Sequence, residues 1–319
     1  MVLAAPAEQA PWAIEVEGLV KRYGNVTAVN GISFAVRRGE TFGLLGPNGA
    51  GKTTTLEIIE GLRRPDAGRV IVEGIDAVAD PQAARSLMGV QLQEAGLFEK
   101  LTVAETIRLF SRLHRRRADV AAIIERLQLT EKANALVGTL SGGQRQRLCI
   151  ALALVNDPKV VFLDEPTTGL DPQARRNLWD IIRSIREDGR TVVLTTHYMD
   201  EAEVLCDRVA IVDQGRLIAM DRPDRLIREH APGVRIHLTP DLAQPPEAVA
   251  AAVRPLSGVN GAAVNDHGDV VVYSHAFEET VDGLMRLARE GAIRYRTMRV
   301  ETANLEDVFL KLTGRRLRD

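Results

Sequence analysis

The chain has 319 residues, of which 45% are hydrophobic and 26% charged, and its formal net charge at pH 7 is −2. These fractions are typical of a soluble globular protein, and the near-neutral charge gives no overall attraction to nucleic acid or to an anionic membrane. No apolar run approaches the ~18 residues of a membrane-spanning helix, and the N-terminus does not match a secretion signal. Cys149 and Cys206 lack metal-ligand spacing, which predicts buried free thiols in a reducing compartment.

The predicted elements alternate between strand and helix patterns. After a tail at residues 1–12, the stretches AIEVEGLVKRYG and GISFAVRRGETFGLLG have the apolar pattern of strands. A helix follows, then a strand at GRVIVEG, and the pattern is mostly helical from about Pro81 to Leu140. From Ser141 the order is helix, strand KVVFLDE, helix, strand TVVLTT, helix, and two strands, RVAIVD and GRLIAM. Strands that alternate with helices predict a parallel α/β sheet.

The segment from Leu44 to Thr55, LLGPNGAGKTTT, matches the phosphate-binding loop G-x-x-x-x-G-K-[ST]. Its glycines let successive backbone N–H groups form a nest for anionic oxygens, and the dipole of the following helix favours the same charge. Lys52 is predicted to reach the β- and γ-phosphates, and the Thr53 hydroxyl to bind Mg²⁺. The predicted nucleotide-binding residues of this loop are Gly46, Pro47, Asn48, Gly49, Ala50, Gly51, Lys52, Thr53 and Thr54.

Two acidic residues, Asp164 and Glu165, end the apolar strand in VVFLDEP. Ligands of an open α/β sheet collect beyond the C-terminal ends of its strands. Asp164 is therefore predicted to hold Mg²⁺ through water, and Glu165 to orient and deprotonate the attacking water. A strand that merely ends in solvated acids is the alternative, but the phosphate loop upstream favours a catalytic pair.

A second glycine nest, LSGGQRQR from Leu140, begins an apolar helix between the phosphate loop and the strand VVFLDE. This combination resembles the ATP-binding cassette (ABC) ATPases. The resemblance implies that the nest completes the ATP site of a second subunit in trans, and that the chain forms a homodimer in its ATP-bound state. The signature residues are Ser141, Gly142, Gly143 and Gln144.

The Q-loop and D-loop of the family can also be matched. Gln93 in VQLQEAG resembles the Q-loop glutamine, which contacts Mg²⁺ and the attacking water. Gln91 is the competing choice, but the acidic Glu94 after Gln93 fits the family pattern better. Asp171 in TTGLDP resembles the D-loop aspartate, which crosses the dimer interface.

Two further residues complete the resemblance, which covers about Ile14 to Ile227. His197, directly after the strand TVVLTT, resembles the switch histidine that contacts the γ-phosphate. Tyr23 in KRYGNVTAV resembles the aromatic residue that stacks on adenine. A structural histidine and an edge-strand tyrosine are the alternatives, but the positions of both residues in the motif series favour function. The implied ligands are ATP and Mg²⁺.

The resemblance implies a P-loop NTPase fold with a RecA-like core sheet, an antiparallel β part and a helical subdomain. It also implies an ATPase subunit that powers a membrane exporter through a separate transmembrane permease, as a peripheral protein on the cytoplasmic face of the membrane. The stretches THYMDEAEVLCDRVAIVDQGRLIAMDRPDRL and NLEDVFLKLTGR are similar to the branch that exports drugs, polyketides and other amphipathic compounds. The helical stretch between Gln93 and Leu140 would receive a cytoplasmic helix of the permease.

Two other functions fit the same cassette. A soluble ABC ATPase acting on DNA or ribosomes would carry coiled-coil or zinc-bearing insertions, or a second cassette, and the sequence has none of these patterns. The basic run HRRR is interpreted as a solvated helix face, so no nucleic-acid partner is expected. An importer ATPase would tend to carry a small β-barrel extension, which the C-terminal pattern does not match.

The predicted domains are the N-terminal tail 1–12, the ABC ATPase domain 13–230 and a C-terminal accessory domain 231–319. Pro232 and Gly233 interrupt the pattern at the second boundary. Beyond it the elements follow the order β-α-β-β-α-β, with a tight turn at HGD, which predicts a small α+β ferredoxin-like domain. This domain has no phosphate nest or acid pair, so we expect it to steady the cassette dimer or the contact with the permease.

Overall fold

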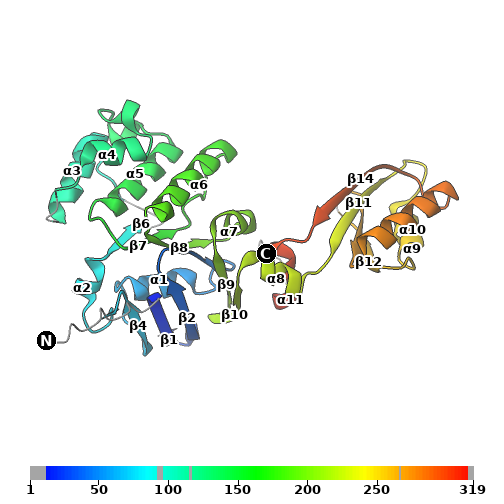
Figure 1. Cartoon of the computed structure of the whole chain (residues 1–319), viewed down its shortest axis with the longest axis horizontal. Coiled ribbons are helices and arrows are strands. Elements are labelled where there is room, and N and C mark those ends of the chain that lie inside the picture. The colour runs from blue at the N-terminus through cyan, green and yellow to red at the C-terminus, as the bar shows by residue number, and fades with distance from the viewer. Residues whose placement is uncertain (1–11, 92–95, 115–116, 266, 315–319) are drawn as a thin grey trace, which may run out of the picture. The chain divides into compact units, whose positions relative to one another are not determined.

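The computed structural model of the chain describes residues 12–91, 96–114, 117–265 and 267–314 (Figure 1). The chain divides into two compact units, and the division falls between Pro223 and Asp224. The sequence predicts the boundary later, after residue 230, because Pro232 and Gly233 interrupt the pattern there, beyond α8 (Pro223–His230). In the structure this helix is part of the second unit. No helix among the described residues is long and apolar enough to cross a membrane.

An antiparallel sheet of four strands, in the order β2-β1-β4-β5, forms one part of the first unit. The long strands β1 and β2 pair along their whole lengths with several bulges, and β4 pairs with the other edge of β1. The strands are β1 (Trp12–Tyr23), β2 (Val26–Arg37), β4 (Ala67–Val72) and β5 (Ile75–Asp76).

The central sheet of the first unit has six strands in the order β10-β9-β3-β8-β7-β6. Neighbouring strands from β9 to β6 are parallel, which confirms the expected α/β sheet, and β10 is antiparallel to β9. Every residue of β3, β7 and β8 is buried, as continuous apolar runs in a parallel sheet require. The strands are β3 (Thr41–Leu45), β6 (Met88–Gln91), β7 (Val160–Asp164), β8 (Thr191–Thr196), β9 (Arg208–Asp213) and β10 (Arg216–Asp221).

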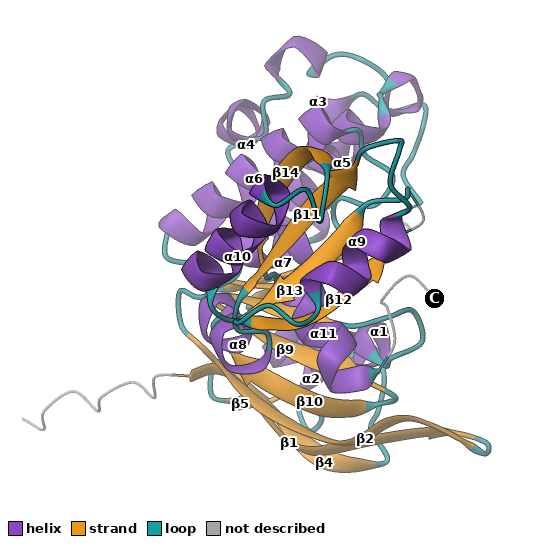
Figure 2. Cartoon of the chain, turned by 90° about the vertical axis from the view of Figure 1, so that its right-hand side faces the viewer, coloured by secondary structure: helices purple, strands orange, loops and turns teal. Residues whose placement is uncertain are grey.

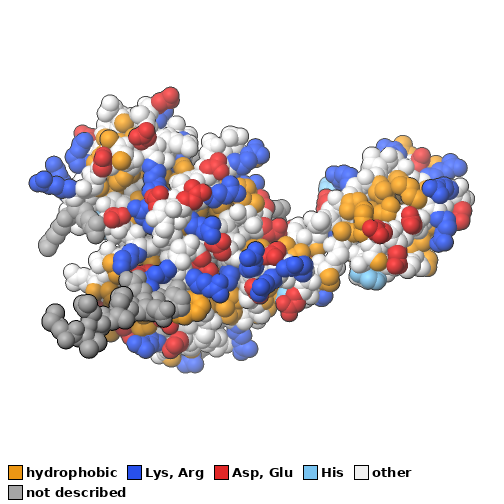
Figure 3. Space-filling view, in the orientation of Figure 1, with side chains coloured by type: hydrophobic (Ala, Val, Ile, Leu, Met, Phe, Trp, Pro, Cys, Tyr) orange, Lys and Arg blue, Asp and Glu red, His pale blue; other side chains and the backbone are white. Residues whose placement is uncertain are grey.

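Helices surround this sheet, and Figure 1 shows α3 to α6 grouped beside the β6–β7 edge. Helix α3 begins at a capping box, in which the Thr102 side chain accepts from the backbone of Glu105 and the Glu105 carboxylate accepts from Thr102. On the face in Figure 3, basic and acidic side chains are interspersed over this unit. Its helices are α1 (Lys52–Ile59), α2 (Pro81–Arg85), α3 (Val103–Leu113), α4 (Val120–Arg126), α5 (Gly142–Leu154), α6 (Pro172–Glu187) and α7 (Met199–Leu205).

The second unit contains the expected β-α-β-β-α-β order, followed by one more helix. Its four strands are antiparallel in the order β12-β13-β11-β14, so the first and third strands lie at the centre of the sheet, as in a ferredoxin-like fold. Figure 2 shows α9 and α10 on the same face, where Ile236, Val249 and Leu284 form part of a separate core. The elements are β11 (Val234–Pro240), α9 (Pro246–Val253), β12 (Val259–Val264), β13 (Val270–Ser274), α10 (Phe277–Arg289), β14 (Tyr295–Thr302) and α11 (Leu305–Thr313).

Candidate nucleotide-binding site

The predicted phosphate loop connects the buried strand β3 to helix α1. Gly51 has a φ of 100°, and a Cβ on it would lie 2.2 Å from the carbonyl oxygen of Ala28. A Cβ on Gly46 would lie 2.2 Å from the carbonyl oxygen of Val212. Only glycine fits at these two positions, because side-chain atoms would overlap backbone atoms of neighbouring strands. The backbone of the loop is therefore fixed from both sides, with the N-terminus of α1 at its end.

Lys52, the first residue of α1, is buried within the loop. Its Nζ atom donates hydrogen bonds to the carbonyl oxygens of Gly46, at 2.8 Å, and Pro47, at 3.1 Å. Burial lowers the pKa of the Lys52 amine, while the nearby carboxylates of Glu165 and Asp164 raise it. The structure thus places a cation between the loop backbone and the two acidic residues.

Asp164 and Glu165 are held at the end of β7 by a residue of the neighbouring strand. Asp164 lies opposite Thr195 of β8, and the Thr195 hydroxyl donates a hydrogen bond to the Asp164 carboxylate. The backbone N–H of Glu165 donates to the same hydroxyl oxygen at 3.0 Å. Burial raises the pKa of Asp164, and hydrogen bonds from Thr195 and Thr53 oppose this shift. One hydroxyl therefore orients both acids.

The residues beside the loop fit a Mg²⁺ ion. Thr53 and Asp164 supply a hydroxyl and a buried carboxylate oxygen, and the Thr53 side chain helps to lower the pKa of Asp164. Mg²⁺ prefers such oxygen ligands and usually takes its remaining ligands from water and substrate phosphates. In the described part of the chain, no group of three or more His, Cys, Asp or Glu residues could hold a metal ion by itself. These two side chains suit an ion that is shared with a nucleotide.

Glu165 and His197 converge on the same hollow. Glu165 adopts a left-handed backbone with a φ of 47°, which is uncommon outside glycine and typical of functional positions. Its Oε1 atom lies 3.3 Å from His197 Nδ1 and 3.8 Å from Lys52 Nζ, and its Oε2 atom accepts from the Thr168 hydroxyl at 3.2 Å. The hollow has a volume of about 660 Å³, a size that suits a nucleotide. It is lined by Ala28, Asn48, Gly49, Gly51, Lys52, Thr53, Thr54, Glu165, Thr168 and His197.

The signature residues and the D-loop residue lie together at a second hollow of about 320 Å³. Ser141 caps α5 in a capping box with Gln144, and Gly142 and Gly143 follow it in the first turn of that helix. The Asp171 carboxylate caps α6 by accepting from two backbone N–H groups at 2.9 Å. The two hollows have no lining residue in common. One chain therefore does not bring its signature nest to its own phosphate loop.

The predicted Q-loop glutamine and the predicted adenine-stacking tyrosine are not among the described residues that line the first hollow. Gln93 lies outside the described residues, and the competing Gln91 is the buried last residue of β6. Tyr23 ends β1 with 40% of its surface exposed, and the guanidinium group of Arg63 lies 5.3 Å from its ring centroid. It does not line the hollow of about 660 Å³.

Sequence reasoning missed three residues that the structure brings to this site: Thr195, Thr168 and Ala28. Thr168 contacts Glu165, and the carbonyl group of Ala28 packs on the phosphate loop. A usable signal existed only for Thr195. It precedes the expected switch histidine by two positions in a strand that was predicted to lie in the same parallel sheet as VVFLD.

The chain is similar in sequence to known ATP-binding proteins. The ABC transporter family model matches residues 29–168. A Nod factor export ATP-binding protein from Ralstonia nicotianae is 42% identical over 96% of this chain and 95% of its own. A daunorubicin resistance ATP-binding protein from Streptomyces coeruleorubidus is 40% identical over 96% and 97%.

A solved ATP-binding cassette dimer in a post-hydrolysis state, bound to ADP and phosphate, is also similar to this chain. It has a TM-score of 0.60 and 27% identity, and the match covers 66% of this chain and 98% of that one. These matches confirm the cassette fold and the family resemblance that the motifs carry. The chain belongs to the ABC transporter family and is an ATPase of that family.

Proposed function

We propose that this ATPase powers the export of a drug or another amphipathic compound through a separate transmembrane permease, at the cytoplasmic face of the membrane. The observation that carries the proposal is the convergence of Lys52, Glu165 and His197 on one nucleotide-sized hollow, in a chain of this family. Similarity to the Nod factor export and daunorubicin resistance proteins extends over 96% of the chain and supports export. It supports neither an importer nor a soluble ATPase.

The proposed reaction begins when the phosphates of ATP displace the loop carbonyls from Lys52. The amine then neutralises phosphate charge, together with the backbone N–H groups of the loop. Glu165 orients a water molecule and accepts its proton, and His197, 3.3 Å from Glu165, contacts the γ-phosphate. Thr53, Asp164 and Gln93 would hold Mg²⁺, which neutralises charge on the phosphates when bound.

The proposed active form is a homodimer. The signature nest has its own hollow, away from the phosphate loop of the same chain. A second copy could therefore present Ser141 and Gly143 to the ATP that this copy holds, with Asp171 beside them at the interface. Such an arrangement gives two composite sites. The dimeric state of the solved cassette with ADP and phosphate supports this proposal.

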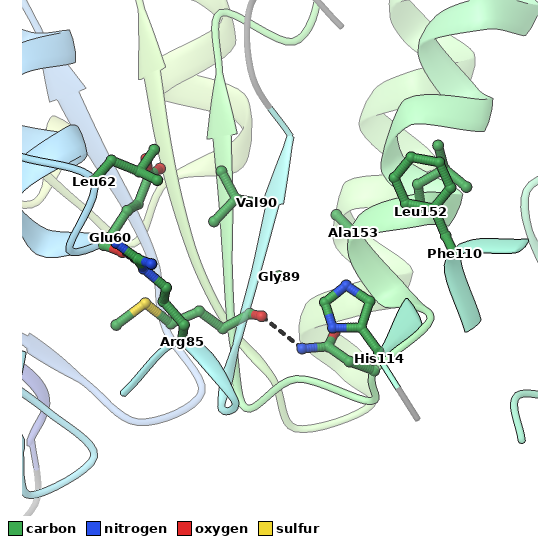
Figure 4. Close-up of a pocket in the computed structure, with 11 residues that line it drawn as sticks. Glu60, Leu62, Arg85, Gly89, Val90, Phe110, His114, Leu152 and Ala153 are labelled. Atoms are coloured by element: carbon green, nitrogen blue, oxygen red, sulfur yellow. Dashed lines mark hydrogen bonds between the residues drawn. The ribbon is translucent and has the colours of Figure 1, made fainter. Parts of the chain in front are cut away.

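A groove near α1 supports the proposed permease contact. A cavity of about 260 Å³ lies among residues of α3, α5, β6 and the end of α1. Figure 4 shows Val90, Phe110 and Leu152 around it, with Glu60 and Arg85 on one side and His114 on the other. Leu62, also in this wall, is 54% exposed. An apolar surface of this kind suits a helix from a membrane subunit.

The test of the proposed chemistry is Glu165→Gln in the full chain. The amide keeps the size of the side chain but cannot accept the proton, so we expect turnover to fall about a thousandfold while ATP binding remains. Light scattering should then show an ATP-dependent dimer. Glu187→Gln, an exposed change on α6, is the control. Wild-type turnover in Glu165→Gln would exclude Glu165 as the base.

A further inference from the structure

Helices α6 and α7 are joined by five side chains that the proposed reaction does not use. The Arg175 guanidinium lies 5.6 Å from the ring centroid of Trp179 and 5.4 Å from that of Tyr198. Arg175 Nη2 is also 3.6 Å from Asp200 Oδ2, and Trp179 Nε1 donates to Glu201 Oε1 at 3.1 Å. We call Arg175, Trp179, Tyr198, Asp200 and Glu201 the α6–α7 clamp.

At one end the clamp contacts the switch histidine. The rings of Tyr198 and His197 have centroids 4.2 Å apart and an interplanar angle of 41°. The backbone N–H of Tyr198 donates to the Thr196 hydroxyl at 2.9 Å, which fixes the turn after β8. His197 Nδ1 is buried and faces Glu165. The position of the Tyr198 ring thus limits where the His197 imidazole can lie.

At its other end the clamp begins one helical turn after the D-loop residue Asp171. The backbone N–H of Arg175 donates to the carbonyl oxygen of Asp171 at 3.0 Å, in the first turn of α6. A Cβ on Gly143 would lie 3.1 Å from the Cβ of Ala174, so the signature helix also packs closely against this turn. A displacement of this turn would therefore move the guanidinium that covers Tyr198.

Glu201 anchors the clamp below the site. It is fully buried, and burial raises the pKa of its carboxyl group, whereas the neighbouring polar side chains of Thr196, Thr167 and Trp179 lower it. Of these three, Trp179 donates a hydrogen bond, to the Oε1 atom of Glu201. Thr196 precedes the switch histidine, and Thr167 precedes the D-loop. Glu201 therefore packs beside both segments, and its hydrogen bond joins α7 to α6 through Trp179.

We propose that Arg175 is a positioning residue, which acts through Tyr198 to hold the His197 imidazole against Glu165 and links its orientation to the D-loop at Asp171. The proposal rests on the proposed function for the role of His197 in hydrolysis. Arg175 touches no reacting atom in the proposed reaction. It sets the position of the His197 imidazole, which does touch the reacting phosphate, and the position of such a group affects turnover more than substrate affinity.

The test is Arg175→Met in the full chain, which keeps the length of the side chain and removes its charge. We expect kcat to fall about tenfold and the KM for ATP to stay within about twofold. Arg175→Lys, which keeps a cation over the rings, should restore most of the rate. Asp200→Asn removes only the ion pair and should change little. If Arg175→Met does not fold, Tyr198→Leu removes the same contact from the other side.

Two measurements separate positioning from a general structural effect. In a His197→Ala background, Arg175→Met should cause no further loss of single-turnover rate, because the group it positions is gone. The NMR signal of the His197 ring, assigned by its loss in His197→Ala, should shift in Arg175→Met and return in Arg175→Lys. An equal loss of rate in both backgrounds, or an unmoved His197 signal, overturns the proposal. If His197→Ala kept wild-type turnover while the His197 signal still shifted in Arg175→Met, the proposed role of His197 in hydrolysis would be wrong. Arg175 would still position the His197 ring.

Discussion

Acidic side chains lie in a buried setting near both ends of α1, but in the described part of the chain only at the N-terminal end is one of them paired with a cation. At the N-terminal end, Asp164 and Glu165 have the Lys52 amine nearby, and the Thr195 hydroxyl bonds to both residues. At the C-terminal end, Glu60 is 3% exposed and caps the helix. Among the described residues no cation or hydrogen-bond donor is paired with its carboxyl group.

This difference indicates at which end of α1 the carboxyl groups are ionised. Burial raises the pKa of Glu60 to about 8, with further contributions from Asp164 and Glu57, so this carboxyl is mostly neutral at pH 7. A carboxylate there would also face the negative end of the helix dipole. The N-terminal end keeps its acids beside a cation and leaves room for a nucleotide. The C-terminal end keeps a neutral acid in the wall of an apolar groove.

The largest effect is expected when the cation at the N-terminal end is removed. Lys52→Ala leaves the phosphates of a bound nucleotide without their matching charge, so we expect ATP affinity to fall by about 100-fold or more. Calorimetric titration with ATP and Mg²⁺ measures this. Lys159→Ala, which removes an amine that is 63% exposed, is the control. Unchanged affinity in Lys52→Ala would mean that the loop backbone alone binds the triphosphate.

A smaller effect should follow when the hydroxyl that bonds to both acidic residues is removed. Thr195→Val removes one hydrogen bond from the Asp164 carboxylate and one from the backbone N–H of Glu165, so we expect the free energy of unfolding to fall by about 1–3 kcal/mol. We also expect ATP turnover to drop, because both acids lose their orientation.

The matched control for Thr195 lies on the same strand. Thr191 is buried as well, and its hydroxyl accepts from the backbone N–H of Gly39 at 3.0 Å, far from the acids. Thr191→Val should therefore lower stability in denaturant melts but keep the turnover number. If the two variants lose turnover equally, Thr195 has only a structural role.

The sequence predicts a residue's role well when the constraint on it acts between residues close together in the chain, and poorly when it depends on how distant strands pair. Gly46 and Gly51 were predicted as parts of the phosphate loop, because the close backbone approach that excludes a Cβ also fixes the glycine spacing. The α/β order followed from apolar runs such as those of β7 and β8. Thr195 needed the register of two strands that are distant in sequence, and local patterns do not encode that register.

The clamp and the buried acid were beyond sequence reasoning for a related reason. Arg175 lies on the amphipathic helix α6 and Glu60 ends α1, and the sequence alone predicts that both charged side chains are exposed to solvent. Only the packing of α6 on α7, and of the end of α1 on its neighbours, shows that their environment differs. The assignment of α8 to the second unit likewise depends on tertiary contacts, because its own pattern fits either side of the boundary.

The last effect is expected at the C-terminal end of α1, where it should be negligible at acidic pH and appear only as pH rises. Because the folded-state pKa of Glu60 is about 8 and its unfolded value lies near 4.5, the folded state binds more protons between these limits. The contribution of Glu60 to stability is then lost as pH rises through this window. Glu60→Gln, which stays neutral, should match the wild type in stability below about pH 4.5 and exceed it by about 1.4 kcal/mol for each pH unit above that, up to the folded-state pKa. Urea melts across this range, with Glu187→Gln as the exposed control, measure the difference. A Glu60→Gln chain that is less stable at pH 8.5 would show that the carboxylate has a partner and that both ends of α1 are built for charge.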